Sequence, residues 1–382
     1  MVHSKLCLSG RVGLQLWASE ADPVGLRPAE RTSGLLLRGM GSTFMAMSDQ
    51  IAAREMAPFR IAPRFVGRVW GYADLRPWYD RVAEGGEPIG EVWLTGDDCL
   101  VATGVQAGKT LGTLFAEDSE AMLGARAQSP ASPLLIKVIF AKEKLSVQVH
   151  PDDRLAQKYG QPRGKTECWF ALAAEPGAQV AAGLKPGVTL DQVREGIQAG
   201  TLEESLNLLP VAAGEVIFVD AGTVHAIWPG SILLETQQNC DLTYRMYDYG
   251  RGRELHIEKG LEATRLVTRA GKVPPRALAD RTILLDEEYF RIERIPVDGS
   301  RTSASLAGDG EPVCGLAYLF AAAGSGRILS PCDEFEPVAL PARGILGVPA
   351  ASPGFAIDDL GGLELIRIVP NWPGKTSSGE AQ

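Results

Sequence analysis

Two histidines, an amide and a carboxylate occur along the chain in positions that suit the ligands of a single metal ion. Histidine is scarce, with only four among 382 residues: His3, His150, His225 and His256. Residues 145–150 alternate between apolar and polar side chains. In a strand the apolar side chains would share one face, and Ser146, Gln148 and His150 the other. Gln148 and His150 would then lie close enough to bind one ion.

Glu167 and His225 are the other two candidate ligands. Glu167 opens the next predicted strand, and His225 follows the predicted strand 216–219 and a tight Ala221-Gly222 turn. Such a turn directs a side chain into a small barrel. Two nitrogen and two oxygen ligands with room for water suit a catalytic divalent cation, and zinc is the first expectation. A neutral amide ligand leaves more positive charge on the ion, which can then polarise a bound hydroxyl or carbonyl.

Either histidine alone would more simply be a hydrogen-bonded core residue, but the combined spacing favours a metal site. His256, at a predicted helix start, is interpreted as structural, and His3 receives no role. Asp220 is expected to loosen the turn that precedes His225 without removing a ligand.

The elements that must position these residues are mostly strands. Short β-rich runs separated by Gly, Pro and Asp turns predict a sandwich or barrel. These runs are residues 134–140, 145–150, 168–172, 216–219 and 232–237, preceded by two strands in 89–101 that are joined at Gly96-Asp97. Helices are predicted over residues 111–126, over an insertion at about 188–209 that includes Leu206, and over 261–267.

The domain boundaries follow from the same reading. Residues 1–57 predict a poorly ordered extension, and 58–270 the metal-binding β domain. A second, smaller β domain is predicted over 276–373, and a loose tail over 374–382. The second domain contains no histidine, so we expect it to pack against the first and to take no part in catalysis.

Composition excludes several classes of protein. A net charge of -9 provides no basic surface for nucleic acid or anionic lipid, and no apolar run has the length of a membrane helix. The six cysteines form no CxxC pair, which disfavours a disulfide framework and a zinc ribbon. We therefore expect a cytoplasmic protein with reduced thiols, acting on a small molecule as a monomer or homodimer.

Four blocks of sequence resemble a known family. They are residues 145–153 (LSVQVHPDD), 164–167 (GKTE), 221–226 (AGTVHA) and 241–251. Together they resemble the type I mannose-6-phosphate isomerases of the cupin superfamily, in the short bacterial-like form, from about residue 65 to the last strands. The resemblance implies a mainly β fold with a cupin-type barrel (jelly roll) and a second, degenerate cupin-like domain. It also implies one zinc ion bound by Gln148, His150, Glu167 and His225, and interconversion of mannose 6-phosphate and fructose 6-phosphate.

The resemblance also implies roles for residues around the metal. Lys165 and Glu235 would lie near the reacting carbons, and either could move the proton. Strand alternation independently puts Glu235 on the same face as Leu233 and Gln237. Arg245 would stabilise the enediolate intermediate.

Phosphate would be held by Ser146 and Arg251. Some family members have a histidine where this chain has Gly164, so that imidazole is absent here. Two alternatives remain open at this stage: a sugar-phosphate-binding cupin without activity, and another metal-dependent cupin enzyme.

Overall fold

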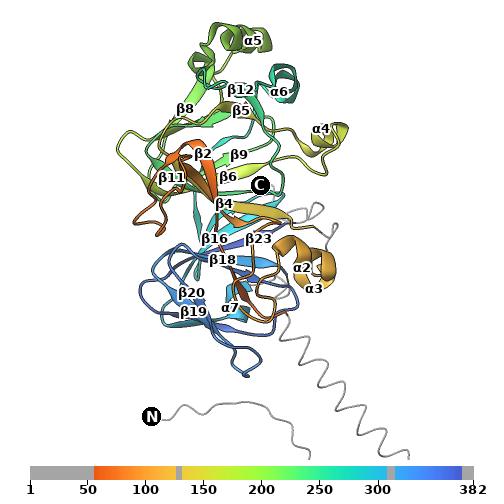
Figure 1. Ribbon diagram of the computed structural model, residues 1–382, viewed down its shortest axis with the longest axis vertical. Coiled ribbons are helices and arrows are strands. Elements are labelled where there is room, and N and C mark those ends of the chain that lie inside the picture. The colour runs from red at the N-terminus through yellow and green to blue at the C-terminus, as the bar shows by residue number, and fades with distance from the viewer. Residues whose placement is uncertain (1–55, 126–130, 308–314, 372–382) are drawn as a thin grey trace, which may run out of the picture.

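The computed structural model describes residues 56–125, 131–307 and 315–371, arranged as four stacked antiparallel β-sheets (Figure 1). Most of the predicted N-terminal extension, and all of the predicted tail, lie outside these ranges. The mainly β prediction is confirmed. No helix in the described ranges is long and apolar enough to cross a membrane.

The first barrel consists of two sheets. Sheet I has the strand order β12 (Tyr244–Tyr247), β5 (Val147–Val149), β10 (His225–Ile227), β7 (Gln179–Leu184) and β8 (Leu206–Pro210). Sheet II has the order β13 (Gly271–Val273), β9 (Val216–Val219), β6 (Glu167–Ala174), β11 (Ser231–Gln238), β4 (Leu134–Ala141), β3 (Ile89–Thr95) and β2 (Arg64–Tyr72).

The second barrel is built in the same way. Sheet III has the order β1 (Phe59–Ile61), β21 (Ile345–Val348), β18 (Ala317–Ala323), β23 (Glu364–Pro370), β16 (Phe290–Pro296), β15 (Thr282–Asp286) and β14 (Arg276–Ala277). Sheet IV has the order β17 (Ser300–Thr302), β22 (Ala356–Asp359), β19 (Gly326–Leu329) and β20 (Val338–Leu340). The short helix α7 (Ser303–Ala307) follows β17.

Helices cover the outer face of sheet I (Figure 1). The predicted insertion begins with α5 (Leu190–Ala199), whose first turn is closed by a reciprocal capping box between Thr189 and Gln192. Gly200, in the left-handed conformation, ends α5, and a 3-10 turn (Leu202–Ser205) leads into β8. The prediction that Leu206 continues a helical face is therefore wrong, because Leu206 starts a strand.

The other helices also differ from their predicted bounds. Residues 111–126 form two short helices, α2 (Leu111–Glu117) and α3 (Ser119–Leu123), because the Asp118 side chain accepts a hydrogen bond from Ala121 N and starts the second. The helix predicted over 261–267 is α6 (Ile257–Ala263), which begins after His256. The remaining helix, α4 (Asp153–Lys158), follows Asp152 as its N-cap.

One strand prediction also changes. The expected second strand in 89–101 is absent from the described structure, where Leu100 and Val101 form only isolated bridges. The strand β1, in a segment for which no strand was predicted, pairs with β21 of the second barrel.

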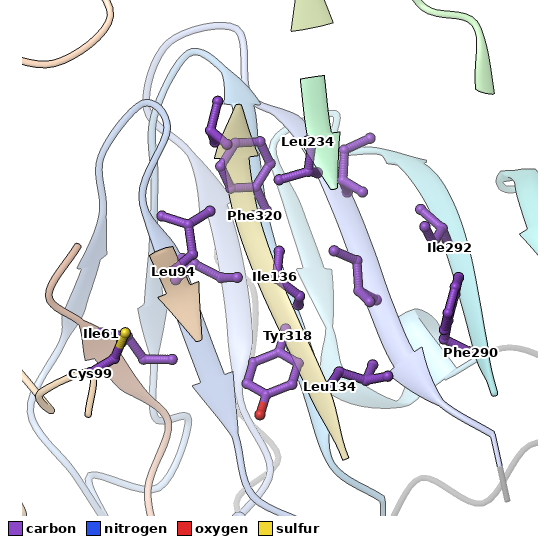
Figure 2. Packing of buried hydrophobic residues seen from close by; sticks show 14 of the residues in the cluster. Ile61, Leu94, Cys99, Leu134, Ile136, Leu234, Phe290, Ile292, Tyr318 and Phe320 are labelled. Atoms are coloured by element: carbon purple, nitrogen blue, oxygen red, sulfur yellow. The ribbon is translucent and has the colours of Figure 1, made fainter. Parts of the chain in front are cut away.

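Alternation along each strand of sheet II fills two cores at once. On β4, Ile136 and Val138 face sheet III, while Lys137 and Ile139 face the interior of the first barrel. Figure 2 shows the core shared by the two barrels, with Ile136 and Leu234 packed near Tyr318 and Phe320 of β18. The expectation that the second barrel packs against the first is thus confirmed.

This shared core generates a stability prediction. Phe320 is fully buried between the barrels, so Phe320→Ala should lower the free energy of unfolding by about 3–5 kcal/mol. Val267→Ala is the surface control, since Val267 is 88% exposed, and it should change that free energy by less than about 0.5 kcal/mol. Urea unfolding measures both. Equal effects of the two substitutions would show that the barrels do not depend on this core.

Candidate metal centre

Three side chains meet between sheets I and II with their metal-binding atoms within 4.8 Å of one another: His150, Glu167 and His225. Each is only 1% exposed. His150 follows β5, His225 opens the adjacent strand β10 opposite Gln148, and Glu167 opens β6 of the facing sheet. The fold therefore brings together residues that lie up to 75 positions apart on three strands.

Backbone carbonyls orient both imidazoles toward the site. His150 Nδ1 donates to Leu242 O at 2.9 Å and His225 Nδ1 donates to Thr223 O at 2.9 Å, so each Nε2 carries its lone pair inward. Each Nε2 lies 3.4 Å from a Glu167 oxygen. Burial lowers the pKa of His150 to about 3 and also lowers the pKa of His225, so both rings are neutral ligands at neutral pH.

Glu167 remains a carboxylate despite its burial. Burial alone would raise its pKa, but the Lys165 ammonium lowers the pKa of Glu167 well below its usual range. Its Oε1 atom is buried and has no hydrogen-bond donor within the described part of the chain. An unsatisfied carboxylate oxygen that faces an imidazole lone pair is what a cation would satisfy, so these residues fit a metal ion.

Gln148 lies at the edge of this cluster. Its amide nitrogen is 3.1 Å from His225 Nε2, and its oxygen accepts a hydrogen bond from Ser146 Oγ at 3.2 Å. Rotation of the amide by half a turn would direct the oxygen toward the cluster. Val147 and Val149 lie on the opposite face, as predicted. Leu145 does not join them, because β5 begins only at Val147 and Leu145 packs in the core between sheets I and II.

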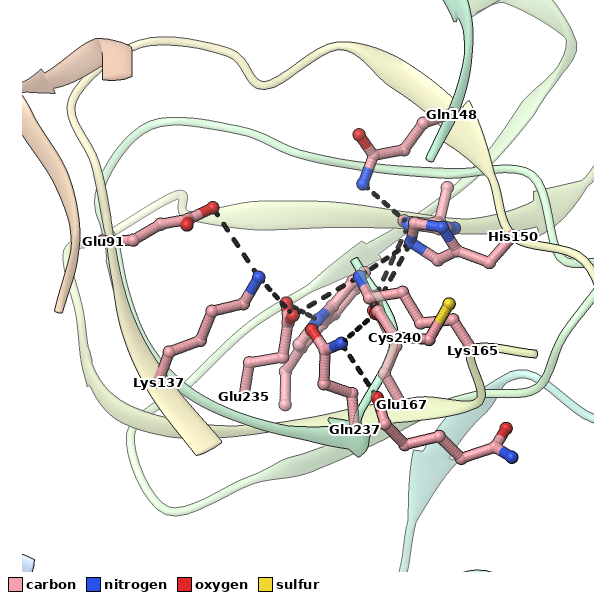
Figure 3. A network of polar contacts seen from close by, with 12 residues as sticks. Glu91, Lys137, Gln148, His150, Lys165, Glu167, Glu235, Gln237 and Cys240 are labelled. Atoms are coloured by element: carbon pink, nitrogen blue, oxygen red, sulfur yellow. Dashed lines mark hydrogen bonds and ion pairs between the residues drawn. The ribbon is translucent and has the colours of Figure 1, made fainter. Parts of the chain in front are cut away.

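A row of alternating charges extends from the cluster across the inner face of sheet II (Figure 3). Lys165 Nζ lies 2.6 Å from Glu167 and 3.5 Å from Glu235. Lys137 Nζ lies 3.0 Å from Glu235 and 3.6 Å from Glu91. Strand pairing makes Lys137 and Glu235 direct neighbours on β4 and β11. The predicted inward orientation of Glu235 is thus what the structure shows.

The pKa values of Glu235 and Glu91, the two carboxylates of this row beyond Glu167, are shifted in opposite directions. Burial and the nearby charge of Glu167 raise the pKa of Glu235, whose other oxygen accepts from Trp169 Nε1 at 3.1 Å. Burial would also raise the pKa of Glu91, but Lys137 and Arg68 lower it to about 2. The row therefore contains two carboxylates with a lowered pKa, Glu167 and Glu91, and one with a raised pKa, Glu235.

The cluster and the charged row open into one cavity of about 450 Å³. Its lining includes one of the two histidines, His225, and six other predicted residues: Ser146, Gln148, Lys165, Glu167, Glu235 and Arg245. Arg245 is held by a hydrogen bond from its guanidinium to Glu254 O at 2.9 Å. The backbone N–H of Arg245 donates a hydrogen bond to His256 Nδ1. His256 itself is not part of the lining.

Arg251 is not among the lining residues. Its guanidinium donates to Lys144 O at 2.8 Å and lies near Glu143 and Asp248, outside the cavity lining. The neighbouring Arg253 lines the cavity instead, together with Arg68.

The lining residues that were not singled out from the sequence include Glu91, Lys137, Arg68 and Arg253. Lys137 carried a usable signal, because it is the one charged residue in the apolar run 134–141. Asp220 also differs from expectation. It stabilises the turn before His225, accepting from Thr223 Oγ1 at 2.9 Å and from Arg269 N at 3.2 Å.

Comparison with known proteins gives consistent results. Residues 59–179 match the family model described as phosphomannose isomerase type I, catalytic domain. The mannose-6-phosphate isomerase of Streptococcus mutans is 34% identical over 283 residues, which are 70% of this chain and 85% of that protein. A crystal structure of the mannose 6-phosphate isomerase from Bacillus subtilis is similar with a TM-score of 0.71 and 28% identity, covering 82% of this chain and 99% of that one. A variant of phosphomannose isomerase from Salmonella typhimurium shares the fold at 16% identity, with a TM-score of 0.66 and coverage of 82% and 100%.

The geometry of the cluster predicts which residues control metal content. His225→Ala removes one of three converging ligands, so metal affinity should fall by more than the roughly 10- to 100-fold that loss of a supporting hydrogen bond costs. Arg245→Ala is the control within the same cavity and should retain its metal. Metal analysis of the dialysed proteins measures both. Full metal content in the His225 variant would place the ion elsewhere.

Proposed function

Because the chain belongs to the type I phosphomannose isomerase family, we propose that it interconverts mannose 6-phosphate and fructose 6-phosphate. The buried His150, Glu167 and His225 cluster on the wall of a charged cavity is the observation that supports this reaction most directly. The reaction moves a proton between C2 and C1 and passes through an enediolate, so it needs an acid/base group and positive charge near the oxygens.

We propose that Gln148, His150, Glu167 and His225 hold one divalent ion, most simply zinc. When bound, the ion would polarise the substrate's carbonyl and hydroxyl oxygens. Neutral imidazoles and one carboxylate suit zinc, and the rotated Gln148 amide would complete the set. The two donors that now face the imidazole lone pairs, Lys165 Nζ and Gln148 Nε2, would give way to the ion.

Glu235 is the better candidate of the two proton carriers. Burial and the charge of Glu167 raise its pKa, the direction that favours a carboxyl as a proton carrier. Lys165 is held as an ammonium, because Glu167 and Glu235 raise its pKa although burial alone would lower it. We therefore assign proton transfer to Glu235 and charge stabilisation to Lys165, with Arg245 stabilising the enediolate from the opposite wall.

The phosphate end of the cavity is assigned to arginines. Arg68 pairs with Glu91 at 2.8 Å and Arg253 binds Asp248 through two nitrogens, yet each guanidinium has further N–H groups available for an anion. Ser146 lines the same cavity. We propose that Arg253 and Arg68, with Ser146, bind the phosphate, and that Arg251 supports the loop that carries Arg253.

A coupled assay tests the activity itself. The metal-replete protein should turn over mannose 6-phosphate, and a chelator should remove that activity until zinc is restored. Saturable binding of the sugar phosphate without turnover would instead favour the non-catalytic cupin. If the protein neither bound nor turned over the sugar phosphate, the proposed function would be contradicted.

The phosphate assignment has its own test. Arg253→Ala should raise the KM for mannose 6-phosphate by roughly tenfold to a hundredfold, as expected for loss of a charge-assisted hydrogen bond. Arg251→Ala is the matched control, because it also removes a neighbour of Asp248, and it should leave KM within about threefold. Steady-state kinetics measures both KM values. If the Arg251 variant showed the larger increase, Arg251 and not Arg253 would be the phosphate ligand.

A further inference from the structure

Tyr289 of the second barrel contacts the segment between β5 and β6, which contains His150 and Lys165. Tyr289 lies in the turn between β15 and β16, and its ring packs against the core shared by the two barrels. Its hydroxyl donates to Asp153 Oδ2 of the first barrel at 3.1 Å. Asp153 lies three residues after His150, at the start of α4.

Asp153 is also hydrogen-bonded to the segment that contains Lys165. Its other oxygen, Oδ1, accepts from Gly164 N at 2.7 Å and from Gln238 Nε2 at 2.9 Å. The Gln238 side-chain oxygen accepts from Thr166 N at 2.9 Å. The backbone N–H groups on both sides of Lys165 are therefore held by two side chains that are hydrogen-bonded to each other.

The segment also fits closely against residues 151–153. Lys165 N donates to Pro151 O at 3.0 Å. A Cβ added to Gly164 would lie 2.5 Å from Pro151 O and 2.7 Å from Asp153 N, so no side chain fits there without displacing backbone. Any movement of Asp153 would thus move the backbone of Lys165, and with it Glu167 two residues further on.

The turn that carries Tyr289 is itself fixed. Asn371 donates to Tyr289 O at 2.9 Å and to Glu287 O at 2.7 Å, and Arg269 of the first barrel pairs with Glu287 at 2.9 Å. Burial and the adjacent Asp153 carboxylate raise the pKa of Tyr289, which keeps its hydroxyl a donor at all ordinary pH values.

We infer that Tyr289, Asp153 and Gln238 form an interdomain clamp that positions Lys165 and Glu167, which makes Tyr289 of the second barrel a positioning residue for the site in the first. The inference rests on the proposed function for its effect on the reaction rate. Its effect on the geometry of the site can be measured separately from turnover.

The test compares two tyrosines at the same interface. Tyr289→Phe keeps the ring in the core and removes only the hydroxyl. Tyr79→Phe is the matched control, because the Tyr79 hydroxyl also crosses between the barrels, to Arg343 O at 3.0 Å, without touching the segments that flank Lys165. Tyr289→Phe should lower kcat about three- to tenfold with KM changed less than twofold. It should also alter the visible absorption bands of the cobalt(II)-loaded protein, which report the arrangement of the Glu167 ligand. The Tyr79 variant should match wild type in both.

A second pair of variants tests the middle of the clamp. Asparagine at 153 can still accept at Oδ1 and can donate to the Tyr289 oxygen, whereas alanine can do neither. Asp153→Asn should therefore stay within about threefold of wild-type kcat, and Asp153→Ala should lose at least about tenfold and shift the cobalt spectrum.

The clamp is overturned if Tyr289→Phe cannot be distinguished from Tyr79→Phe in both kcat and spectrum, or if Asp153→Ala behaves like Asp153→Asn. Should the wild-type protein not turn over mannose 6-phosphate at all, the proposed function fails. The cobalt spectra of the four variants would still decide for or against the clamp.

Discussion

Alternating charge between two apolar sheets is the constraint on which the site depends. Glu167, Lys165, Glu235, Lys137 and Glu91 are all buried, and each carboxylate or ammonium has an opposite charge within 3.6 Å. Isolated charges at such depth would cost several kcal/mol each. Compensation also differentiates the carboxylates. Lys165 lowers the pKa of Glu167, whereas burial and the charge of Glu167 raise the pKa of Glu235. One row of charges therefore contains the carboxylates for which we propose a metal-binding role and an acid/base role.

The same constraint explains why the protein has two barrels. Sheet II carries charged residues among the apolar ones on the face that lines the site, whereas its opposite face is apolar. That face needs an apolar partner, which sheet III provides. The second barrel contains no histidine, yet it buries this face and, through Tyr289, extends to the loops of the site.

Strand periodicity allowed much of the site to be predicted. A period of two residues was enough to place Gln148 and His150 on one face of β5, and Glu235 toward the interior of the barrel. That Arg253 and not Arg251 lines the cavity could not be predicted in this way, because both lie in an irregular loop. There Tyr249, Gly250 and Gly252 all have positive φ, and no period determines which arginine turns inward. The pairing of β1 with β21 and the contact from Tyr289 to Asp153 are long-range, and no local pattern in a single sequence encodes them. Helix bounds were displaced where a cap residue such as Asp118, or a left-handed glycine such as Gly200, ended a helix that the apolar spacing would have continued.

The pairing of β1 with β21 has a consequence for biosynthesis. Phe59 lies opposite Gly347, so the first strand of sheet III leaves the ribosome about 290 residues before its partner. The first barrel can assemble meanwhile, but it does so with the outer face of sheet II, including Ile136, Phe140 and Phe170, uncovered. A nascent chain at this stage presents a broad apolar surface and an unpaired strand, the features that recruit chaperones and promote misassembly.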